Sequence, residues 1–456
     1  MKKKKNYEKF WKLGKEEFNT QFFGISKDGE LVVREGNYQY NIYDLVSKFG
    51  SPLEIAFPFI VEKRYLDLVQ TFNFYIKTFN YKGRFFYHYP MKVNQNKEFV
   101  LPLISEGANL ETGSYNELWL VHKLWEQDQF HSRIRVICNG PKTEKYLGLI
   151  QELKGKGLSI IPIIEDLSEY KSLKKYTGDV GIRTKMEIKA KSRWIKKNDR
   201  YGFAPEEIYE LGRIRNLKIL HYHLGSQTMN QEGLIEAANT ATEIYAKIKK
   251  NNPTLDTLDI GGGMAIPYEK KKFYGAANVV RKIISTISKI CAEREIPHPN
   301  IIAEWGRYIM APAQITVFKV LCEKPINNVS AKKWYIVDGS FMNDLIDTWA
   351  IHQKWHITPV NNMRAEKLTK VWLAGSSCDS DDRYTAGGSY ILLPPIEETN
   401  GDYQYIALFD SGAYQDALAS HHCLLSSPAK IIAQNGVLTI ARRHESPEEI
   451  GKMFGW

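Results

Sequence analysis

Lys92 is the residue of this chain with the clearest chemical use, because it stands at the polar end of an aromatic, strand-like run, FFYHYPM over residues 85–91. Burying a lysine amine costs free energy, so most lysines lie at the surface. A partly desolvated amine is a better nucleophile and can form a Schiff base. The alternative is a lysine whose ammonium group reaches solvent from the end of a strand.

The region around the GGG and EWGR motifs carries groups that suit a phosphorylated, pyridine-type cofactor. Gly261, Gly262 and Gly263 follow a strand-like segment, where backbone N–H groups can approach a phosphate, although many glycine runs are simply turns. Arg307 could pair with the same phosphate. Glu304 would point inward, where a buried carboxylate can hold a protonated pyridine nitrogen. A structural ion pair between Glu304 and Arg307 is the alternative.

Two histidines end another strand-like segment, in the run HYHLGSQ that starts at His221. Side chains two residues apart on a strand point to the same side, so His221 and His223 would both face the interior. An imidazole could stack on a cofactor ring, and the Ser226 hydroxyl could donate to a phosphate. A hydrogen-bonded core histidine is the alternative, and no spacing here suggests a metal site.

The C-terminal part of the chain adds a thiol and several acidic groups. Cys378 lies in the run SSCDSDD, whose carboxylates raise the pKa of a thiol, so Cys378 would donate a proton rather than stand as a thiolate. Asp379 and Asp347 suit a cationic substrate with an amine or a guanidinium group. Tyr414 could place its hydroxyl on a phosphate. An Asp/Ser-rich turn and a capped helix start just before Tyr414 are the alternatives.

The composition is that of an ordinary soluble globular chain of 456 residues, with 43% hydrophobic and 25% charged residues. A scattered net charge of +10, without a nucleic-acid-binding signature, predicts no nucleic-acid partner. Five widely spaced cysteines without a CxxC pair argue against a disulfide framework and favour a cytoplasmic protein. We expect no signal peptide and no membrane partner, because no long apolar stretch is present.

Eight short apolar segments alternate with amphipathic helical stretches and predict the elements that position these groups. Such alternation implies parallel pairing, and eight units over this length match a (β/α)8 TIM-like barrel, with a doubly wound sheet as the alternative. Chemistry in a barrel gathers at the C-terminal strand ends. The residues at or just past these ends are Lys92, Glu111, Asn139, Glu165, Arg183, His223, the run Gly261, Gly262 and Gly263, and Glu304. The expected strands are residues 84–91, 108–112, 134–139, 158–164, 180–183, 219–223, 255–260 and 301–304.

The segments after about residue 312 alternate or run apolar between Gly, Asn and Pro, and predict a C-terminal antiparallel β-barrel or sandwich domain. Hairpin-like strands at 30–33 and 38–43 could join the same sheet. The expected fold class is therefore α/β in three parts. These are an N-terminal segment over 1–52 that contributes to the β domain, the barrel over 53–312, and the β domain over 313–456.

Together these motifs resemble the fold-type III pyridoxal-phosphate-dependent decarboxylases, which unite ornithine, diaminopimelate and arginine decarboxylases. The resemblance covers about residues 40–422 and is closest to the biosynthetic arginine decarboxylases. The motifs that carry it are YPMKVNQ (89–95), VICNG (136–140), HLGSQ (223–227), DTWAI (347–351), CDSD (378–381) and GAYQ (412–415).

The resemblance implies a pyridoxal 5'-phosphate enzyme that decarboxylates a basic amino acid, first of all L-arginine to agmatine and CO2 for polyamine and spermidine biosynthesis. It implies that Lys92 forms the Schiff base, His223 stacks on the ring, and Cys378 protonates the product carbon. It implies an obligate homodimer with shared active sites, because Cys378 and Asp379 would come from the other subunit. The other implied contacts are to the ring nitrogen (Glu304), the phosphate (Ser226, Gly261, Gly262, Gly263, Gly306, Arg307, Tyr414), the polar edge of the ring (Glu111, Arg183) and the substrate cation (Asp347, Asp379).

Two departures from the family pattern bear on the substrate. Trp305 stands where these enzymes usually carry proline or serine, which could reshape the phosphate site or the pocket, and the chain lacks the long insertions of larger arginine decarboxylases. Ornithine, lysine and diaminopimelate therefore stay open as substrates. A non-catalytic regulatory homologue and an amino-acid racemase stay open as other classes. Glu304 favours decarboxylation over racemisation, because a carboxylate at the ring nitrogen strengthens the electron sink.

Overall fold

The computed structural model describes residues 5–127, 134–186, 188, 200–269, 271, 273–385, 389–396 and 402–456. The chain forms two compact units. The barrel unit comprises Glu62–Ala265 and Tyr274–Ile309, and the β unit comprises Met1–Val61, Ile266–Phe273 and Met310–Trp456. A search of the described residues finds no helix that is long and apolar enough to cross a membrane.

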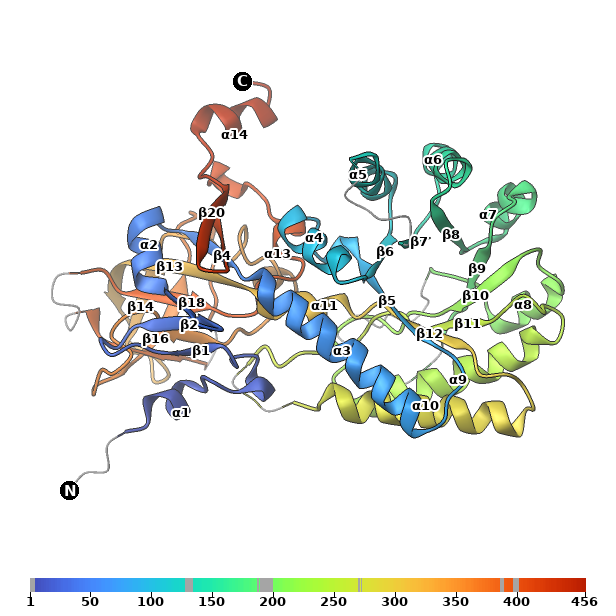
Figure 1. The fold of residues 1–456 in the computed structure, drawn as a ribbon. Coiled ribbons are helices and arrows are strands. Elements are labelled where there is room, and N and C mark those ends of the chain that lie inside the picture. Colours follow the sequence, from blue (N-terminus) through green and yellow to red (C-terminus); the bar gives the residue numbers. More distant parts are fainter. Residues whose placement is uncertain are drawn as a thin grey trace. The chain divides into compact units, whose positions relative to one another are not determined.

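Eight parallel strands of the barrel unit close into a barrel, as the sequence predicted (Figure 1). Each strand overlaps its expected range. β10 ends two residues earlier than expected, so His223 lies in the loop after the strand rather than on it. The strands are β5 (Phe85–Pro90), β6 (Asn109–Thr112), β7 (Arg135–Cys138), β8 (Ser159–Ile164), β9 (Val180–Arg183), β10 (Leu217–His221), β11 (Thr257–Asp259) and β12 (Asn300–Ala303).

Helices follow the barrel strands because the connecting loops end in residues that cap a helix N-terminus. The side chains of Ser114, Thr143 and Asp166 accept backbone N–H groups of the first turns of α5, α6 and α7. The helices of this unit are α3 (Pro58–Thr78), α4 (Lys97–Ser105), α5 (Tyr115–Glu126), α6 (Glu144–Gly155), α7 (Leu167–Ser172), α8 (Pro205–Leu211), α9 (Gln231–Lys249), α10 (Ala276–Glu293) and α11 (Gly306–Met310), with the 3-10 turns η2 (Met91–Val93) and η3 (Leu173–Lys175).

The interior of the barrel is filled by a cluster of isoleucines from four strands. Ile137, Ile163, Ile219 and Ile302 are fully buried and pack together with Ile161. Successive side chains of a strand alternate between its two faces, so the residue two positions after an inward isoleucine also faces inward. In all four strands this next inward residue is polar: Asn139, Glu165, His221 and Glu304. The isoleucine cluster therefore forms the floor beneath a polar group at the C-terminal strand ends.

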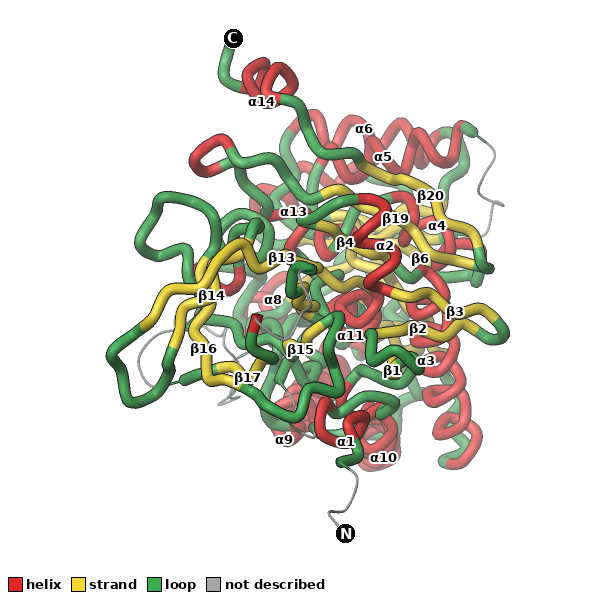
Figure 2. The backbone as a smooth tube through the Cα atoms, turned by 90° about the vertical axis from the view of Figure 1, so that its left-hand side faces the viewer, coloured by secondary structure: helices red, strands yellow, loops and turns green. Residues whose placement is uncertain are grey.

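The β unit contains a nine-stranded sheet that is mixed rather than purely antiparallel as expected. β14 pairs with β16 in parallel, as does β4 with β19, while the other pairs are antiparallel. Figure 2 shows β14 and β16 side by side. Its strands are β4 (Leu53–Ala56), β13 (Gln314–Pro325), β14 (Lys333–Val337), β15 (Ile357–Pro359), β16 (Thr369–Ala374), β17 (Ile391–Leu393), β18 (Tyr405–Leu408), β19 (Ala429–Gln434) and β20 (Val437–Arg442). Its helical elements beyond Met310 are η4 (Ala311–Ala313), α12 (Asp347–Ile351), α13 (Gln415–Leu418), η6 (His422–Leu424) and α14 (Pro447–Met453).

The N-terminal hairpin does not join that sheet, which corrects the expectation from the sequence. β2 (Leu31–Glu35) pairs with β3 (Tyr38–Asn41) and with β1 (Phe23–Ile25) in a separate three-stranded sheet. The alternation of side chains predicted strands but not their partners, because a hairpin can pair with either of two sheet edges. The strand that does enter the large sheet is β4, between α2 (Ile42–Phe49) and α3. The first helical elements in the described part of the chain are α1 (Tyr7–Trp11) and η1 (Glu16–Phe18).

Candidate active site

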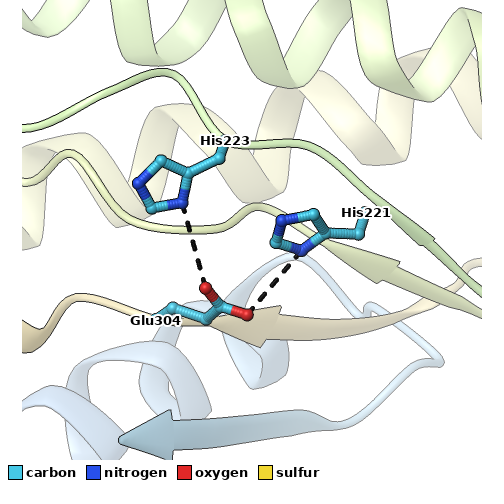
Figure 3. A group of neighbouring side chains, drawn as sticks. All are labelled: His221, His223 and Glu304. Carbon is cyan, nitrogen blue, oxygen red and sulfur yellow. Dashed lines mark ion pairs between the residues drawn. The ribbon is translucent and has the colours of Figure 1, made fainter. Parts of the chain in front are cut away.

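Glu304 is the central acid at the C-terminal end of the barrel. It is 2% exposed, and its Oε1 atom accepts a hydrogen bond from Asn139 Nδ2 at 3.0 Å. The Nδ1 atoms of His221 and His223 lie 3.7 and 3.9 Å from its two oxygens (Figure 3). Burial, reinforced by the charge of Asp259, raises the pKa of Glu304 to about 8. Among the described residues, the ion-pair partners of this carboxylate are two histidines and no lysine or arginine.

His221 and Asp259 form a buried pair beside this acid. His221 Nδ1 lies 2.8 Å from Asp259 Oδ2, and Asp259 Oδ1 accepts the Gly261 N–H at 2.9 Å. Burial lowers the pKa of His221 to about 4 and raises that of Asp259 to about 7. A neutral His221 therefore donates to Asp259 and fixes the wall of the site on the side of Glu304.

The ligand atoms of His221, His223 and Glu304 lie within 4.8 Å of one another, a grouping that no spacing in the sequence indicated. The nitrogens that face Glu304 are already engaged. Nδ1 of His221 contacts Asp259, and Nδ1 of His223 accepts the Gly262 N–H at 3.1 Å. Burial lowers the pKa of His223 well below its usual value, so the ring is neutral. A flat, neutral imidazole beside a carboxylate suits an aromatic cation better than a metal ion.

Lys92 lies on η2, immediately after β5, rather than on the strand itself. Its Nζ atom is 3.2 Å from Oε2 of Glu111, a carboxylate that is fully buried at the end of β6. The lysine side chain is 43% exposed, so a ligand can reach its amine although the amine is paired with Glu111. Glu111 thus directs the amine of Lys92 toward the C-terminal end of the barrel.

Arg183 ends β9 and is held by two neighbours. Its Nη1 atom lies 3.4 Å from Glu165 Oε1, and its guanidinium group stacks on Tyr201 with 4.5 Å to the ring centre. Glu165 is fixed in turn by the Gly140 N–H, at 2.8 Å. The structure therefore places Arg183 at the rim of the site with a paired charge.

The residues expected around a phosphate lie together on the loops after β10, β11 and β12. Arg307 Nε donates to Ser226 Oγ at 3.2 Å. The backbone is tightly packed here: a Cβ atom on Gly261, whose φ is +57°, would lie 2.2 Å from the Tyr222 carbonyl oxygen. A Cβ atom on Gly262 would lie 2.7 Å from Cε1 of His223. Glycine is required at both positions, and the N–H groups of Gly261 and Gly262 are donated to Asp259 Oδ1 and His223 Nδ1.

The indole of Trp305 packs against aromatic side chains of α3 and α11. The residue after Glu304 alternates to the outer face, and the indole is 1% exposed. It packs on Phe72 of α3, with 5.7 Å between ring centroids, and edge-on to Tyr308. Trp305, which departs from the family pattern, therefore takes part in the packing of helices around the barrel.

The remaining expected residues belong to the β unit. Asp347 begins α12 and is 2% exposed. Its carboxylate accepts from Gln415 Nε2 at 3.1 Å, and its N–H donates to Gln415 Oε1 at 3.2 Å. Tyr414 is the N-cap of α13, with a φ of +70°, so neither an Asp nor a Ser caps that helix. Cys378 is exposed, and its thiol lies 3.5 Å from that of Cys423.

Sequence reasoning placed Asn139 at a strand end and His221 on the inward face of its strand. It gave no role to the other residues that the structure brings to these groups, which are Asp259, Gln415, His422 and Cys423. For Asn139 and His221 a signal existed, since each stands two positions after an inward isoleucine. For Gln415 and Cys423 none existed, because their partners lie 68 and 45 residues away in the chain.

The site fits pyridoxal phosphate by the chemistry of its donors and acceptors. Oε2 of Glu304 and Oε1 of Glu111 are buried and accept no hydrogen bond from the described residues. Buried acceptors are almost always paired, so two orphaned carboxylate oxygens in one site indicate a missing polar partner. A protonated ring nitrogen would pair with the first, and the amine of Lys92 already stands beside the second carboxylate.

Comparisons with known proteins agree with this reading. A biosynthetic arginine decarboxylase of Prochlorococcus marinus is 25% identical over 551 aligned positions, covering 91% of this chain and 84% of that protein. The crystal structure of the Campylobacter jejuni biosynthetic arginine decarboxylase matches with a TM-score of 0.84 at 19% identity, covering 99% of this chain and 92% of that one. Diaminopimelate decarboxylase of m. jannaschii, solved with L-lysine, matches with a TM-score of 0.79 at 21% identity, covering 95% and 97%. Because the two solved structures are only 19% and 21% identical to this chain, their likeness establishes the fold alone.

The family model "Pyridoxal-dependent decarboxylase, pyridoxal binding domain" matches residues 67–311, which is more than half of the chain. The matched range contains the whole closed barrel, with Lys92, His223 and Glu304 just past the ends of three of its strands. The resemblance expected from the sequence is thereby confirmed, and the chain belongs to the pyridoxal-dependent decarboxylases, enzymes that break a carbon–carbon bond with the help of pyridoxal phosphate.

Proposed function

We propose that this enzyme decarboxylates L-arginine to agmatine and CO2. The observation that carries the reaction type is Glu304, a buried carboxylate with one unpaired oxygen at the C-terminal end of the barrel. The observation that favours arginine is the likeness, over most of both chains, to proteins named biosynthetic arginine decarboxylases. Agmatine is a polyamine precursor, so the proposed place of the enzyme is polyamine biosynthesis.

Pyridoxal phosphate, when bound, supplies a ring that accepts the electron pair left by the departing CO2. In this proposal Lys92 holds its aldehyde carbon, and the carboxylate of Glu304 holds the proton on its ring nitrogen. The imidazole of His223 would lie against the ring, and Glu111 and Arg183 would bind its polar edge. Its phosphate is held by Ser226, Gly261, Gly262, Gly263, Gly306, Arg307 and Tyr414.

The substrate is bound and protonated by residues of the β unit. Asp347 and Asp379 pair with the guanidinium group of the substrate. A bidentate carboxylate–guanidinium pair neutralises the charge and also fixes the orientation of the group. Cys378 delivers the proton to the product carbon. The hydrogen bond with Cys423 raises the pKa of Cys378, which keeps the thiol protonated and able to donate. We further propose a cytoplasmic homodimer in which Cys378 and Asp379 serve the active site of the partner subunit.

The substrate assignment is tested by incubating the pyridoxal-phosphate-loaded protein separately with L-arginine, L-ornithine, L-lysine and meso-diaminopimelate. We expect CO2 and agmatine from arginine, and a kcat/KM for the other three amino acids that is lower by about 10²-fold or more. A site that binds a guanidinium group leaves its buried polar groups unpaired when the substrate ends in a different group. CO2 from a different member alone would keep the reaction and overturn the substrate. Interconversion of enantiomers without CO2 would instead support a racemase.

Gln415 gives a prediction about how Asp347 is oriented. The Gln415→Leu variant removes both side-chain hydrogen bonds to Asp347 and the one to the Ala413 carbonyl. A hydrogen bond to a charged group contributes about 1.5–3 kcal/mol, so KM for arginine should rise by about tenfold or more with a smaller change in kcat. Gln404→Leu is the matched control: Gln404 is equally buried in the β unit but bonds Asn361 and Tyr405. Equal KM values for the two variants would contradict this role of Gln415.

A further inference from the structure

The thiols of Cys378 and Cys423 contact each other on the surface of the β unit. Their Sγ atoms are 3.5 Å apart, within hydrogen-bond distance for sulfur, and either atom can be the donor. Both cysteines are exposed, and no other sulfur–sulfur contact occurs among the described residues. Of the other cysteines, Cys138 and Cys291 are buried, whereas Cys322 is exposed on β13.

The loops that carry the two thiols are each fixed by a buried polar side chain. Asn343 donates to the His422 carbonyl at 3.0 Å and accepts the His422 N–H at 3.2 Å, which fixes the residue before Cys423. Asp382 accepts the N–H of Ser377, the residue before Cys378, at 3.2 Å. Both anchoring side chains are nearly inaccessible. The backbone next to each thiol is therefore held by a buried side chain.

A second contact joins the same two segments. Nε2 of His422 lies 3.1 Å from Oδ2 of Asp379. Each of the two adjacent residues to which the proposed function gives a role, Cys378 and Asp379, thus faces one residue of the His422–Cys423 segment. The His422–Cys423 segment therefore contacts both the proposed proton donor and the proposed substrate carboxylate.

We propose that Cys378 and Cys423 are a redox modification site, at which a peroxide converts the two thiols into an intrachain disulfide and so stops decarboxylation. The loss of activity rests on the proposed function, in which Cys378 is the proton donor. Exposed disulfides are the labile ones that thiol reductants open again, so the modification is reversible. In a reducing compartment the enzyme stays active, and oxidative conditions switch it off.

The chemistry balances with hydrogen peroxide as the oxidant. One thiol loses its proton, and its sulfur attacks a peroxide oxygen, which breaks the O–O bond and releases the first water as a sulfenic acid forms. The neighbouring thiol then attacks that sulfur, the S–S bond forms, and the hydroxyl group leaves as the second water. The two sulfurs together lose two electrons, and the peroxide gains them. Because Cys423 raises the pKa of Cys378, the oxidation should speed up as pH rises above neutrality.

The test treats the holoenzyme with hydrogen peroxide, removes the oxidant with catalase, and measures free thiols, peptide masses and arginine decarboxylation. We expect the loss of two thiols per chain and a linked pair of peptides containing Cys378 and Cys423, lighter by two hydrogen atoms. Activity should fall at least about tenfold, in step with this species, and dithiothreitol should restore all three readouts.

Cys423→Ser is the decisive variant, because a serine hydroxyl keeps a hydrogen-bonding group beside Cys378 but cannot form the disulfide. After peroxide treatment it should yield no linked peptides, and its Cys378 should be found oxidised but unpaired. Cys322→Ser is the matched control, an exposed cysteine outside the pair, and should behave like the unaltered protein.

Failure of this inference is distinguishable from failure of the proposed function. Recovery of Cys378 and Cys423 as separate, unlinked peptides after oxidation overturns the site, whatever the enzyme's substrate. A linkage between chains overturns it as well, and a mixture of isotopically labelled and unlabelled protein detects that case. Formation of the intrachain disulfide without loss of decarboxylation overturns the switch.

Discussion

Replacing Lys92 with arginine is expected to lower kcat by about 10⁴-fold or more, the scale of effect when an enzyme loses a nucleophile that works as part of a unit. The variant keeps the positive charge beside Glu111, which lies 3.2 Å from the lysine amine. A guanidinium group cannot lose its proton in a protein, so it cannot bind the cofactor's aldehyde carbon. The experiment therefore separates covalent attachment from charge.

The measurement combines steady-state kinetics with borohydride treatment of the loaded protein. Borohydride fixes a lysine–cofactor bond as a stable amine, so the unaltered protein should carry the cofactor on the peptide with Lys92, and Lys92→Arg should not. Lys142→Arg is the matched control, since Lys142 is buried and paired with Glu169 at 3.1 Å. We expect that control to change stability and to keep the cofactor on Lys92. Labelling of another lysine in the unaltered protein would contradict the assignment.

Replacing Glu304 with glutamine is expected to lower kcat by about 10²–10³-fold, or about 3–4 kcal/mol, the scale seen when one preorganised electrostatic group is lost. A glutamine amide can keep the contact with Asn139 Nδ2. It has no negative charge to hold a proton on the ring nitrogen, so the ring accepts electrons less well. The same variant should retain phosphate binding, because the glycine loop and Arg307 are unchanged.

The control for Glu304 is Glu169→Gln, which removes the charge of another buried carboxylate at the same end of the barrel. It breaks the pair with Lys142, and breaking a buried pair costs about 3–5 kcal/mol of stability. We expect Glu169→Gln to lower the unfolding midpoint but to leave kcat of the folded, loaded enzyme close to that of the unaltered protein. A kcat for Glu304→Gln within about threefold of the unaltered value would rule out the proposed role.

The raised pKa of Glu304 also predicts how the stability of the cofactor-free protein depends on pH. The folded state holds its proton up to about 8, above the usual 4.5, so it binds more protons than the unfolded chain in that window. Stability must then fall as pH rises from about 4.5 to about 8. Urea unfolding of the cofactor-free protein should show this fall, and Glu304→Gln should make it smaller. An equal slope for both proteins would contradict it.

The sequence alone was sufficient for the barrel and for the residues at its strand ends. Apolar segments that alternate with helices allow few folds, and the polar residue that ends an apolar strand marks the catalytic face of a barrel. Lys92, Glu111, Arg183 and Glu304 were predicted in this way, and the structure places all four at the C-terminal strand ends. The roles of these residues, unlike their places, remain proposals.

Tertiary structure decided which side chains meet. The strand period predicts the face on which a residue lies, so His221 could be placed inside the barrel, but its partner Asp259 sits on the next strand, 38 residues away. The pairs Asp347–Gln415 and Cys378–Cys423 join loops whose closeness depends on how the mixed sheet is ordered. Tertiary structure also decided the partners of the N-terminal hairpin, which pairs with β1 in a separate three-stranded sheet. Local patterns determine the direction of a side chain, whereas its neighbours depend on long-range packing that no local pattern encodes.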